Sequence, residues 1–294
     1  MAQALDALEL SPRQAMLRRA RRHKGLLIGS AIMLAMALVA VLAPLLAPYD
    51  PNFQNLAQRL MPPAWDAGGH LSHLLGTDNL GRDYLSRILY GARVSLTIGV
   101  GASLIGAVIG VGLGVSAGFF GGRVDQAITY LLTCRLALPG LLLIMSLVFL
   151  IGPSVTSVIC VIGMLHWTYY LVVTRAETLR IRQLDFVAAA RALGSSRLQI
   201  MLHEIVPNLF NQIAVVFTLE MGLAILSEAA LSFLGVGVPP PTPSWGSMIA
   251  EGRNAMFFRP WLVVLPGLAL FVVVVAVNLL GDGVRDVTAP ESRN

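Results

Sequence analysis

The stretch SLTIGVGASLIGAVIGVGLGVSAG, residues 95–118, contains no charged side chain and is long enough to cross a lipid bilayer as one helix. A hydrocarbon core about 30 Å thick is spanned by roughly 20 apolar residues. The whole chain has the same character, because 56% of its 294 residues are hydrophobic, 13% are charged and the mean hydropathy is +0.73. A soluble core cannot bury that much apolar surface, so we expect lipid to be the solvent of this protein.

Six apolar runs of this kind occur along the chain and predict six membrane-spanning helices. They cover residues 26–46, 95–118, 136–151, 155–173, 213–234 and 261–280. The third run is short, but residues 128–134 can extend its helix backward, with Arg135 close enough to the bilayer interface to snorkel. The sequence therefore predicts an all-α integral membrane protein with six transmembrane helices.

Basic residues are distributed unevenly between the two sides of such a membrane protein. With the N-terminus inside, most of the 21 Lys and Arg residues fall on the inner side, as expected because positive segments resist translocation. The sequence pI of about 9.7 does not indicate a nucleic-acid partner, since no basic stripe is interleaved with aromatic residues. Both termini are therefore expected in the cytoplasm.

The longest predicted inner loop, residues 174–210, is too polar to span the membrane and begins with a short helical pattern. Residues 184–193 include three consecutive alanines, which favour a helix. Gly194 can adopt the left-handed conformation that commonly ends a helix. The loop is therefore expected to turn back on itself after this first short helix.

A second helix is predicted on the far side of this turn. Ser195 or Ser196 can cap its N-terminus, and apolar residues recur at helical spacing as far as Ile205. Pro207 is expected to interrupt the helix shortly afterward. The two short helices predict a compact hairpin on the cytoplasmic side of the membrane.

Several segments of the chain carry a resemblance to a known family. They are residues 185–194 (DFVAAARALG) with 205–208 (IVPN), 73–83 (HLLGTDNLGRD), 85–93 (LSRILYGAR), 228–235 (EAALSFLG), 241–246 (PTPSWG) and 278–286 (NLLGDGVRD). The first pair resembles the coupling-loop signature of ABC importer permeases. The remaining segments resemble the C-type permease of the dipeptide and oligopeptide import branch, so the resemblance covers nearly the whole chain.

The resemblance implies a type I ABC importer permease fold. The implied divisions are a basic cytoplasmic N-terminal tail (1–25), the first transmembrane helix with an extracytoplasmic segment (26–94), a core permease domain (95–281) containing the cytoplasmic loop 174–210, and a cytoplasmic C-terminal tail (282–294). The implied coupling residues are Asp185, Phe186, Ala189, Ala190, Arg191, Gly194, Pro207 and Asn208. The chain departs from the family pattern at Ala188, where an acidic residue often stands, and after Asp286, where the usual basic ending is missing.

An ATP-driven importer of this kind needs other polypeptides. A phosphate-binding P-loop requires a lysine after its glycine-rich turn, and the one lysine of this chain, Lys24, follows no such turn. The expected partners are two P-loop ATPase subunits that bind ATP and Mg, a second homologous permease forming a heterodimer, an extracytoplasmic solute-binding protein and membrane lipid. No cofactor and no catalysis are expected on this chain, which the resemblance places in the bacterial inner membrane as a multi-pass subunit.

Charged and polar residues within the predicted spans are candidates for the translocation path, because they are costly in hydrocarbon. Glu220 and Glu228 lie on the fifth span, and Asn278 lies on the sixth. Either carboxylate could pair with the amino group of a transported peptide. Helix packing or a polar contact to the second permease explains Glu228 equally well.

The second span also carries glycines at every fourth position, Gly106, Gly110, Gly114 and Gly118, and the next in the series is Gly122. Small residues at this spacing leave one face of a helix flat, so another helix can approach closely. Packing within the same chain is the leading interpretation, and an interface with the second permease is the alternative.

Two other classes of protein remain open from the residues alone. An ion-gradient-driven secondary transporter should carry interrupted helices with acidic residues near the midplane in both halves, and such symmetry is not evident. An intramembrane serine hydrolase could use Ser116, which lies in a Gly-x-Ser-x-Gly pattern, or Ser154 with His166. A membrane-spanning helix, however, lacks the strand-to-helix elbow that this pattern requires. The histidines have no metal-ligand spacing, so no metal site is predicted.

Overall fold

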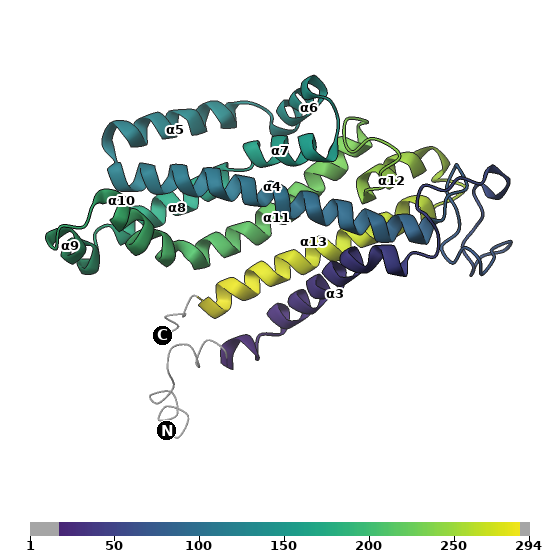
Figure 1. Ribbon diagram of the computed structural model, residues 1–294, viewed down its shortest axis with the longest axis horizontal. Coiled ribbons are helices and arrows are strands. Elements are labelled where there is room, and N and C mark those ends of the chain that lie inside the picture. The colour runs from purple at the N-terminus through teal and green to yellow at the C-terminus, as the bar shows by residue number, and fades with distance from the viewer. Residues whose placement is uncertain (1–17, 289–294) are drawn as a thin grey trace.

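A computed structural model describes residues 18–288, in which long helices pack side by side and are joined by shorter helices and loops (Figure 1). The helices are α3 (Lys24–Leu46), α4 (Tyr84–Phe120), α5 (Gly122–Ala137), α6 (Gly140–Ile151), α7 (Val155–Leu165), α8 (Thr168–Ile181), α9 (Asp185–Ala192), α10 (Arg197–Gln199), α11 (Phe210–Phe233), α12 (Trp245–Gly252) and α13 (Trp261–Thr288). The described residues contain no strand, so the predicted all-α class is confirmed. Residues 1–17 and 289–294, which belong to the two predicted tails, lie outside the described residues.

Five helical segments are long and apolar enough to cross a membrane. They are Lys24–Leu46, Tyr84–Phe120, Val155–Ile181, Arg197–Phe233 and Trp261–Thr288. The second of these begins well before residue 95, because Asp83 caps it by accepting a hydrogen bond from the Ser86 N–H. These five segments correspond to five of the six predicted spans.

The third predicted span is not a single straight helix. α5 and α6 meet at 88°, because Pro139 lacks an N–H group and disfavours a helical conformation at Leu138, which is extended. α6 alone is about 18 Å long, too short for a bilayer core of about 30 Å. A sixth span therefore exists only if the bent pair is counted as one.

The bend also places Arg135 beside the end of α7. Its guanidinium donates two hydrogen bonds to the carbonyl oxygen of Leu165, at 3.3 and 3.2 Å. Leu165 is the last residue of α7, where helix carbonyls lack intrahelical partners. Arg135 thus ties the α5–α6 bend to the break between α7 and α8.

α4 is the central helix of the bundle and packs against α3, α7, α8 and α11, while α3 also packs along α13 (Figure 1). One apolar core lies between α3, α4, α11, α12 and α13, and a second lies between α4, α6, α7 and α11. At its N-terminal end, α12 is joined to α4, since Trp245 donates from its backbone to Ser95 and from its indole to the Ile88 carbonyl. α4 and α11 therefore connect both cores.

The glycine face of α4 lies against α8 of the same chain. A Cβ atom at Gly110 would overlap the Trp167 carbonyl oxygen and the Tyr170 Cβ, and one at Gly114 would overlap the Thr174 hydroxyl and the Leu171 carbonyl oxygen. At Gly118 it would lie 2.7 Å from the Thr178 Cβ. Gly106 faces the His166 carbonyl just before α8 begins. Gly122 is not part of this face, because α4 ends at Phe120 and Gly122 begins α5.

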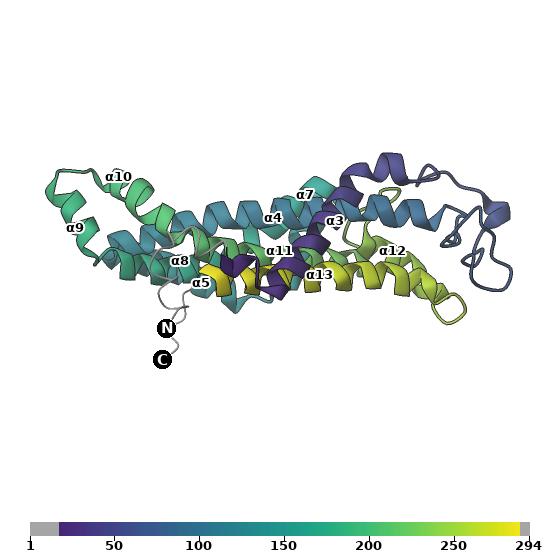
Figure 2. The same cartoon turned by 90° about the horizontal axis from the view of Figure 1, so that it is seen from below.

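The two ends of the bundle differ in construction. α9 and α10 project at one end, and residues 47–83 form irregular loops at the other (Figures 1 and 2). α3 begins and α13 ends on the side of α9 and α10, where His23 Nε2 lies 3.0 Å from Asp286 Oδ2. The start of the first span and the end of the last one therefore lie toward the same end as the hairpin.

Candidate functional site

The hairpin at the α9 end is built on a specific helix terminator. α9 ends at Ala192, Leu193 is its C-cap, and Gly194 has a φ of 87°. The Ser195 N–H donates to Ala190 O and the Gly194 N–H donates to Arg191 O, both at 3.1 Å. This pair of bonds is the Schellman motif, which satisfies the last carbonyls of the helix and turns the chain sharply.

The second arm of the hairpin does not stop at Pro207 as the sequence predicted. Ser196 caps it by accepting from the Gln199 N–H at 3.3 Å, and the chain then stays helical from Arg197 to Phe233. A π-helical segment, Ile200–Ile205, precedes a 3-10 segment, Val206–Leu209, that contains the proline. The changed hydrogen-bond spacing accommodates a residue that has no N–H to donate, so the helix continues.

The hairpin is packed firmly onto the end of the bundle. Val187 of α9 is fully buried among Ile181, Ile200, Ile205 and Leu209. Between α8 and α9, Arg182 donates to the Gly118 carbonyl at 2.8 Å, which ties this turn to the end of α4. A shift of the hairpin as a unit would therefore also shift α8, α11 and the end of α4.

The outer face of the hairpin is exposed. Asp185, Phe186, Ala189, Arg191, Gly194, Pro207 and Asn208 are exposed, and Ala190 is half-buried. Several large apolar side chains, including Leu193 and Leu198, are also exposed there. A cavity of about 560 Å³ lies beside them, lined by Phe119, Phe120, Arg191, Ser195, Ser196, Arg197 and Ile200. An exposed patch of apolar and basic side chains of this kind is typical of a protein-docking surface.

A buried polar pair joins α11 to the break between α7 and α8. Glu220 is 2% exposed, and its Oε2 lies 2.7 Å from His166 Nδ1. An ionised carboxylate only accepts, so it would pair with the form of the imidazole that carries a hydrogen on Nδ1. His166 Nε2 lies 3.5 Å from the Ser227 hydroxyl. The sequence singled out Glu220, but only the fold shows that His166 is its partner.

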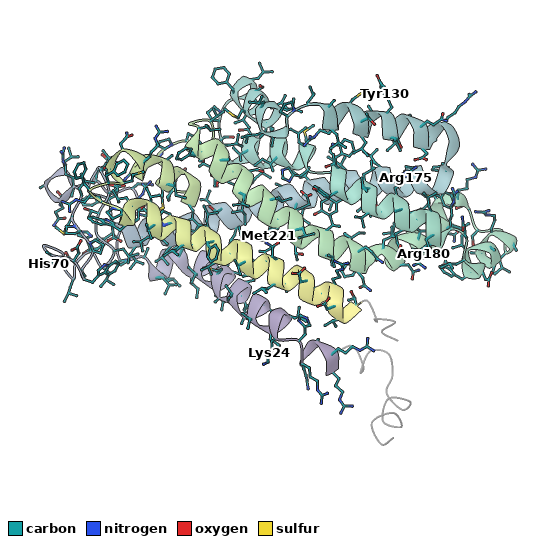
Figure 3. All side chains as sticks on the ribbon, turned by 180° about the vertical axis from the view of Figure 1, so that it is seen from behind. Lys24, His70, Tyr130, Arg175, Arg180 and Met221 are labelled. Carbon is teal, nitrogen blue, oxygen red and sulfur yellow. The ribbon has the colours of Figure 1, made fainter. Side chains whose placement is uncertain are left out.

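A cavity of about 300 Å³ lies beside this pair, between α8, α11 and α13. Its walls are formed by Tyr169, Val173, Val216, Leu219, Glu220, Gly222, Leu223, Leu226, Val274 and Asn278. Met221, which follows Glu220, is near the middle of the molecule's length, whereas Arg175 and Arg180 lie toward the hairpin and His70 lies at the opposite end (Figure 3). The fold therefore brings Glu220 and Asn278 together on one cavity, about midway between the two ends.

Glu228, the third residue predicted on the path, lies elsewhere. It is fully buried, and its Oε1 accepts from the Ser232 and Ser244 hydroxyls, each at 2.7 Å. Ser244 is the N-cap of α12, so these bonds join α11 to α12. Glu228 does not line the cavity of Glu220 and Asn278.

A cluster of four charged residues, three of them buried, holds the opposite end together. Arg82 lies 2.6 Å from both Asp78 and Glu251, and the fully buried Arg87 lies 3.4 Å from Asp78 and 3.0 Å from Glu251. Glu251 belongs to α12 and the other three to residues 78–87, so the cluster joins segments far apart in sequence. The sequence shows four arginines and four aspartates within residues 50–93, which indicates that charged pairs can form there. It does not indicate that Glu251 joins them.

We expect replacement of Arg87 by methionine to lower the stability of the protein by about 3 kcal/mol, toward the lower end for breaking a buried ion pair. The loss is moderated because Arg82 still contacts both acids. Thermal unfolding in detergent should show a lower apparent Tm than for Arg93→Met, which removes an exposed arginine from the same helix. Adding Glu251→Gln to Arg87→Met should recover part of the loss; equal Tm values for the two single variants would contradict the role of the cluster.

Comparison with known proteins now decides the family. Residues 110–294 match the family described as "Binding-protein-dependent transport system inner membrane component", and residues 11–63 match the "N-terminal TM domain of oligopeptide transport permease C". The first match alone covers more than half of the chain. The protein belongs to this permease family.

Several relatives named as peptide or glutathione transport permeases resemble this permease over nearly its whole length. It is 40% identical over 271 residues to the "Dipeptide transport system permease protein DppC" of Haemophilus influenzae, covering 92% of each chain. It is 42% identical to the "Di/tripeptide transport system permease protein DppC" of Pseudomonas aeruginosa, over 92% of this chain and 90% of that one. It is 38% identical to the "Glutathione transport system permease protein GsiD" of Escherichia coli, over 93% and 89%.

Membership identifies the chain as a multi-pass inner-membrane subunit of a binding-protein-dependent transport system. Neither of the two serines considered for an intramembrane hydrolase has the geometry that such an enzyme requires. Ser154 caps α7 and pairs with Ser157, whereas His166 contacts Glu220 and Ser227. Ser116 lies within the continuous helix α4, so it has no elbow to expose it.

Proposed function

We propose that this permease forms one half of the membrane pathway of an ATP-driven peptide importer and works by alternating access. The observation that carries the proposal is the continuity between the hairpin and the cavity. α8 leads into the hairpin, the segment Arg197–Phe233 leads out of it, and both contribute walls to the cavity. A rigid-body push on the hairpin is therefore transmitted to the central cavity, as alternating access requires.

The exposed face of the hairpin would dock on one of two P-loop ATPase subunits, which would hold ATP and Mg; this chain would carry no cofactor and no catalysis. Asp185 to Gly194 would make most of this contact, with Arg191 as its basic group. The hairpin end and both termini would then lie in the cytoplasm, as the distribution of Lys and Arg favours. A second, homologous permease would complete the pathway as a heterodimer.

The opposite end would receive an extracytoplasmic solute-binding protein. Residues 50–91 and the loop 239–245 contain several prolines, which restrict the backbone, so they would offer a stiff surface there. Phe257 and Phe258, in the loop before α13, are among the exposed side chains of the described residues. The peptide cargo is proposed because the relatives are named as permeases for dipeptides, for di- and tripeptides and for glutathione.

Purification of the tagged chain from its native membrane tests this proposal. We expect a second permease and P-loop ATPases to copurify. We also expect the complex in proteoliposomes to take up a labelled dipeptide when ATP is supplied on the side of the ATPase subunits and the binding protein on the opposite side. Omitting the binding protein or the ATP provides the matched controls. Recovery of the chain alone, with uptake driven by an ion gradient, would contradict the proposal and favour a secondary transporter.

A further inference from the structure

The cavity between α8, α11 and α13 combines mostly apolar walls with two polar side chains that have unused hydrogen-bonding capacity. Glu220 Oε2 is hydrogen-bonded to His166, and its Oε1 has no hydrogen-bond partner within the described part of the chain. The amide of Asn278 likewise has none among the residues described. A carboxylate that is 2% exposed and only half satisfied is costly, so a donor that enters the cavity gains a strong acceptor.

The open side of this cavity does not suit contact with lipid. Leu219, Leu223 and Leu226 on α11 are each a little under half exposed, and Tyr169 on α8 is 62% exposed. These side chains line the cavity together with Glu220. An acidic side chain open to hydrocarbon is costly, and such residues in membrane proteins face water or protein instead. This face therefore borders water or protein rather than the bilayer.

We propose that the cavity binds a primary ammonium group together with the apolar side chain next to it, as found at the amino terminus of a peptide. Glu220 Oε1 accepts from the ammonium group, the Asn278 amide bonds to the adjoining peptide unit, and Val216 and Val274 contact the side chain. His166 holds the carboxylate in place from its other oxygen. The inference rests on the proposed function and assigns a ligand to one site within it.

The size of the cavity limits what it holds. A volume of about 300 Å³ corresponds to about ten water molecules and lies at the lower end of ligand pockets. It therefore accommodates one terminal residue and part of the next rather than a whole oligopeptide. Acetylation of the amino terminus removes the positive charge that Glu220 requires, so an acetylated peptide is expected to bind poorly.

Protection of a single cysteine from alkylation tests the site without the binding protein, which would select peptides by itself. Leu223→Cys, in the wall of the cavity and 43% exposed, serves as the reporter. The chain also carries Cys134→Ala and Cys160→Ala, because both native cysteines are exposed. The purified complex in nanodiscs is treated with a small maleimide in the presence of leucyl-alanine or N-acetyl-leucyl-alanine. Phe257→Cys, at the opposite end of the molecule, provides the control reporter.

We expect leucyl-alanine, but not its acetylated form, to slow the labelling of Leu223→Cys, and neither peptide to affect Phe257→Cys. Adding Glu220→Gln should raise the half-protecting concentration by at least about tenfold, as expected for loss of a charge-assisted hydrogen bond. Glu220→Asp, which keeps the charge, should retain part of the protection. These results together would support the site.

Equal protection by the two peptides, protection that survives Glu220→Gln, or no protection at all would overturn the proposal. Uptake of leucyl-alanine by the same complex with its binding protein separates this failure from a failure of the proposed function. ATP-dependent uptake that persists without protection, or with unchanged kinetics in Glu220→Gln, rejects the site and leaves the importer function intact. Absence of ATP-dependent uptake in the parent complex rejects the proposed function itself.

Discussion

Replacing Gly114 with valine is expected to prevent α4 from packing against α8 and to abolish most of the folded protein. A Cβ atom at Gly114 would overlap the Thr174 side chain and lie 2.7 Å from the Leu171 carbonyl oxygen and 3.1 Å from the Arg175 nitrogen. Two of these three atoms belong to the backbone of α8, which cannot rotate away as a side chain can. We expect a loss of about 3 kcal/mol or more, the upper end for overpacking.

Gly112 on the same helix provides the matched control, because a Cβ atom there meets nothing within 4 Å. Gly112→Val makes the same chemical change and has the same effect on helix propensity, so a difference between the two variants measures packing alone. Size-exclusion chromatography of the fluorescently tagged variants in detergent, followed by thermal unfolding, gives the comparison. Similar yield and apparent Tm for Gly114→Val and Gly112→Val would show that the glycine face is not required for close packing.

Replacing Gly194 with proline is expected to uncouple ATP hydrolysis from transport while leaving the bundle folded. Proline cannot adopt the φ of 87° found at Gly194, and it cannot donate the N–H that bonds to Arg191 O. The Schellman turn that sets the angle between the hairpin arms is therefore lost. Uptake should fall at least about tenfold, a factor that a change of only ~1.4 kcal/mol produces.

Gly194→Asn is the control for this prediction, because asparagine tolerates the left-handed conformation and keeps its N–H. We expect this variant to transport nearly as well as the parent. ATP hydrolysis and peptide uptake are measured on the same proteoliposomes, and copurification of the second permease reports on assembly. Normal uptake in Gly194→Pro would exclude the hairpin angle as the coupling element.

The hairpin shows how far local sequence reasoning extends. The first arm, the left-handed Gly194 and capping by either Ser195 or Ser196 were predictable, because helix propensity, the glycine conformation and side-chain capping act within a few residues. Only the structure shows that the cap is Ser196. The course of the chain after Ile205 was not predictable. A proline normally ends a helix, but here a π segment and a 3-10 segment accommodate it, and packing of Ile205 and Leu209 onto the bundle favours continuation.

The polar residues within the membrane were recognised one by one, but their pairings were not. Glu220, Glu228 and Asn278 attract attention because charged and polar groups are costly in hydrocarbon. Nothing in their spacing indicates that Glu220 contacts His166, or that Glu228 bonds to the cap of α12 instead of lining the cavity. The first contact joins residues that are 54 positions apart and the second joins residues 16 apart, so both depend on how the helices pack.

The sequence alone determined that this chain is an all-helical membrane protein of the binding-protein-dependent permease family, since apolar run length and local motifs are properties of contiguous residues. The tertiary structure decided that the α5–α6 pair bends at Pro139, that the glycine face of α4 receives α8, and that Arg87 and Arg82 share Asp78 and Glu251. It also decided that Glu220 and Asn278 border one cavity. The physical reason is that buried polar and small residues take their partners from the helices packed against them, and residues far apart in the sequence supply those partners.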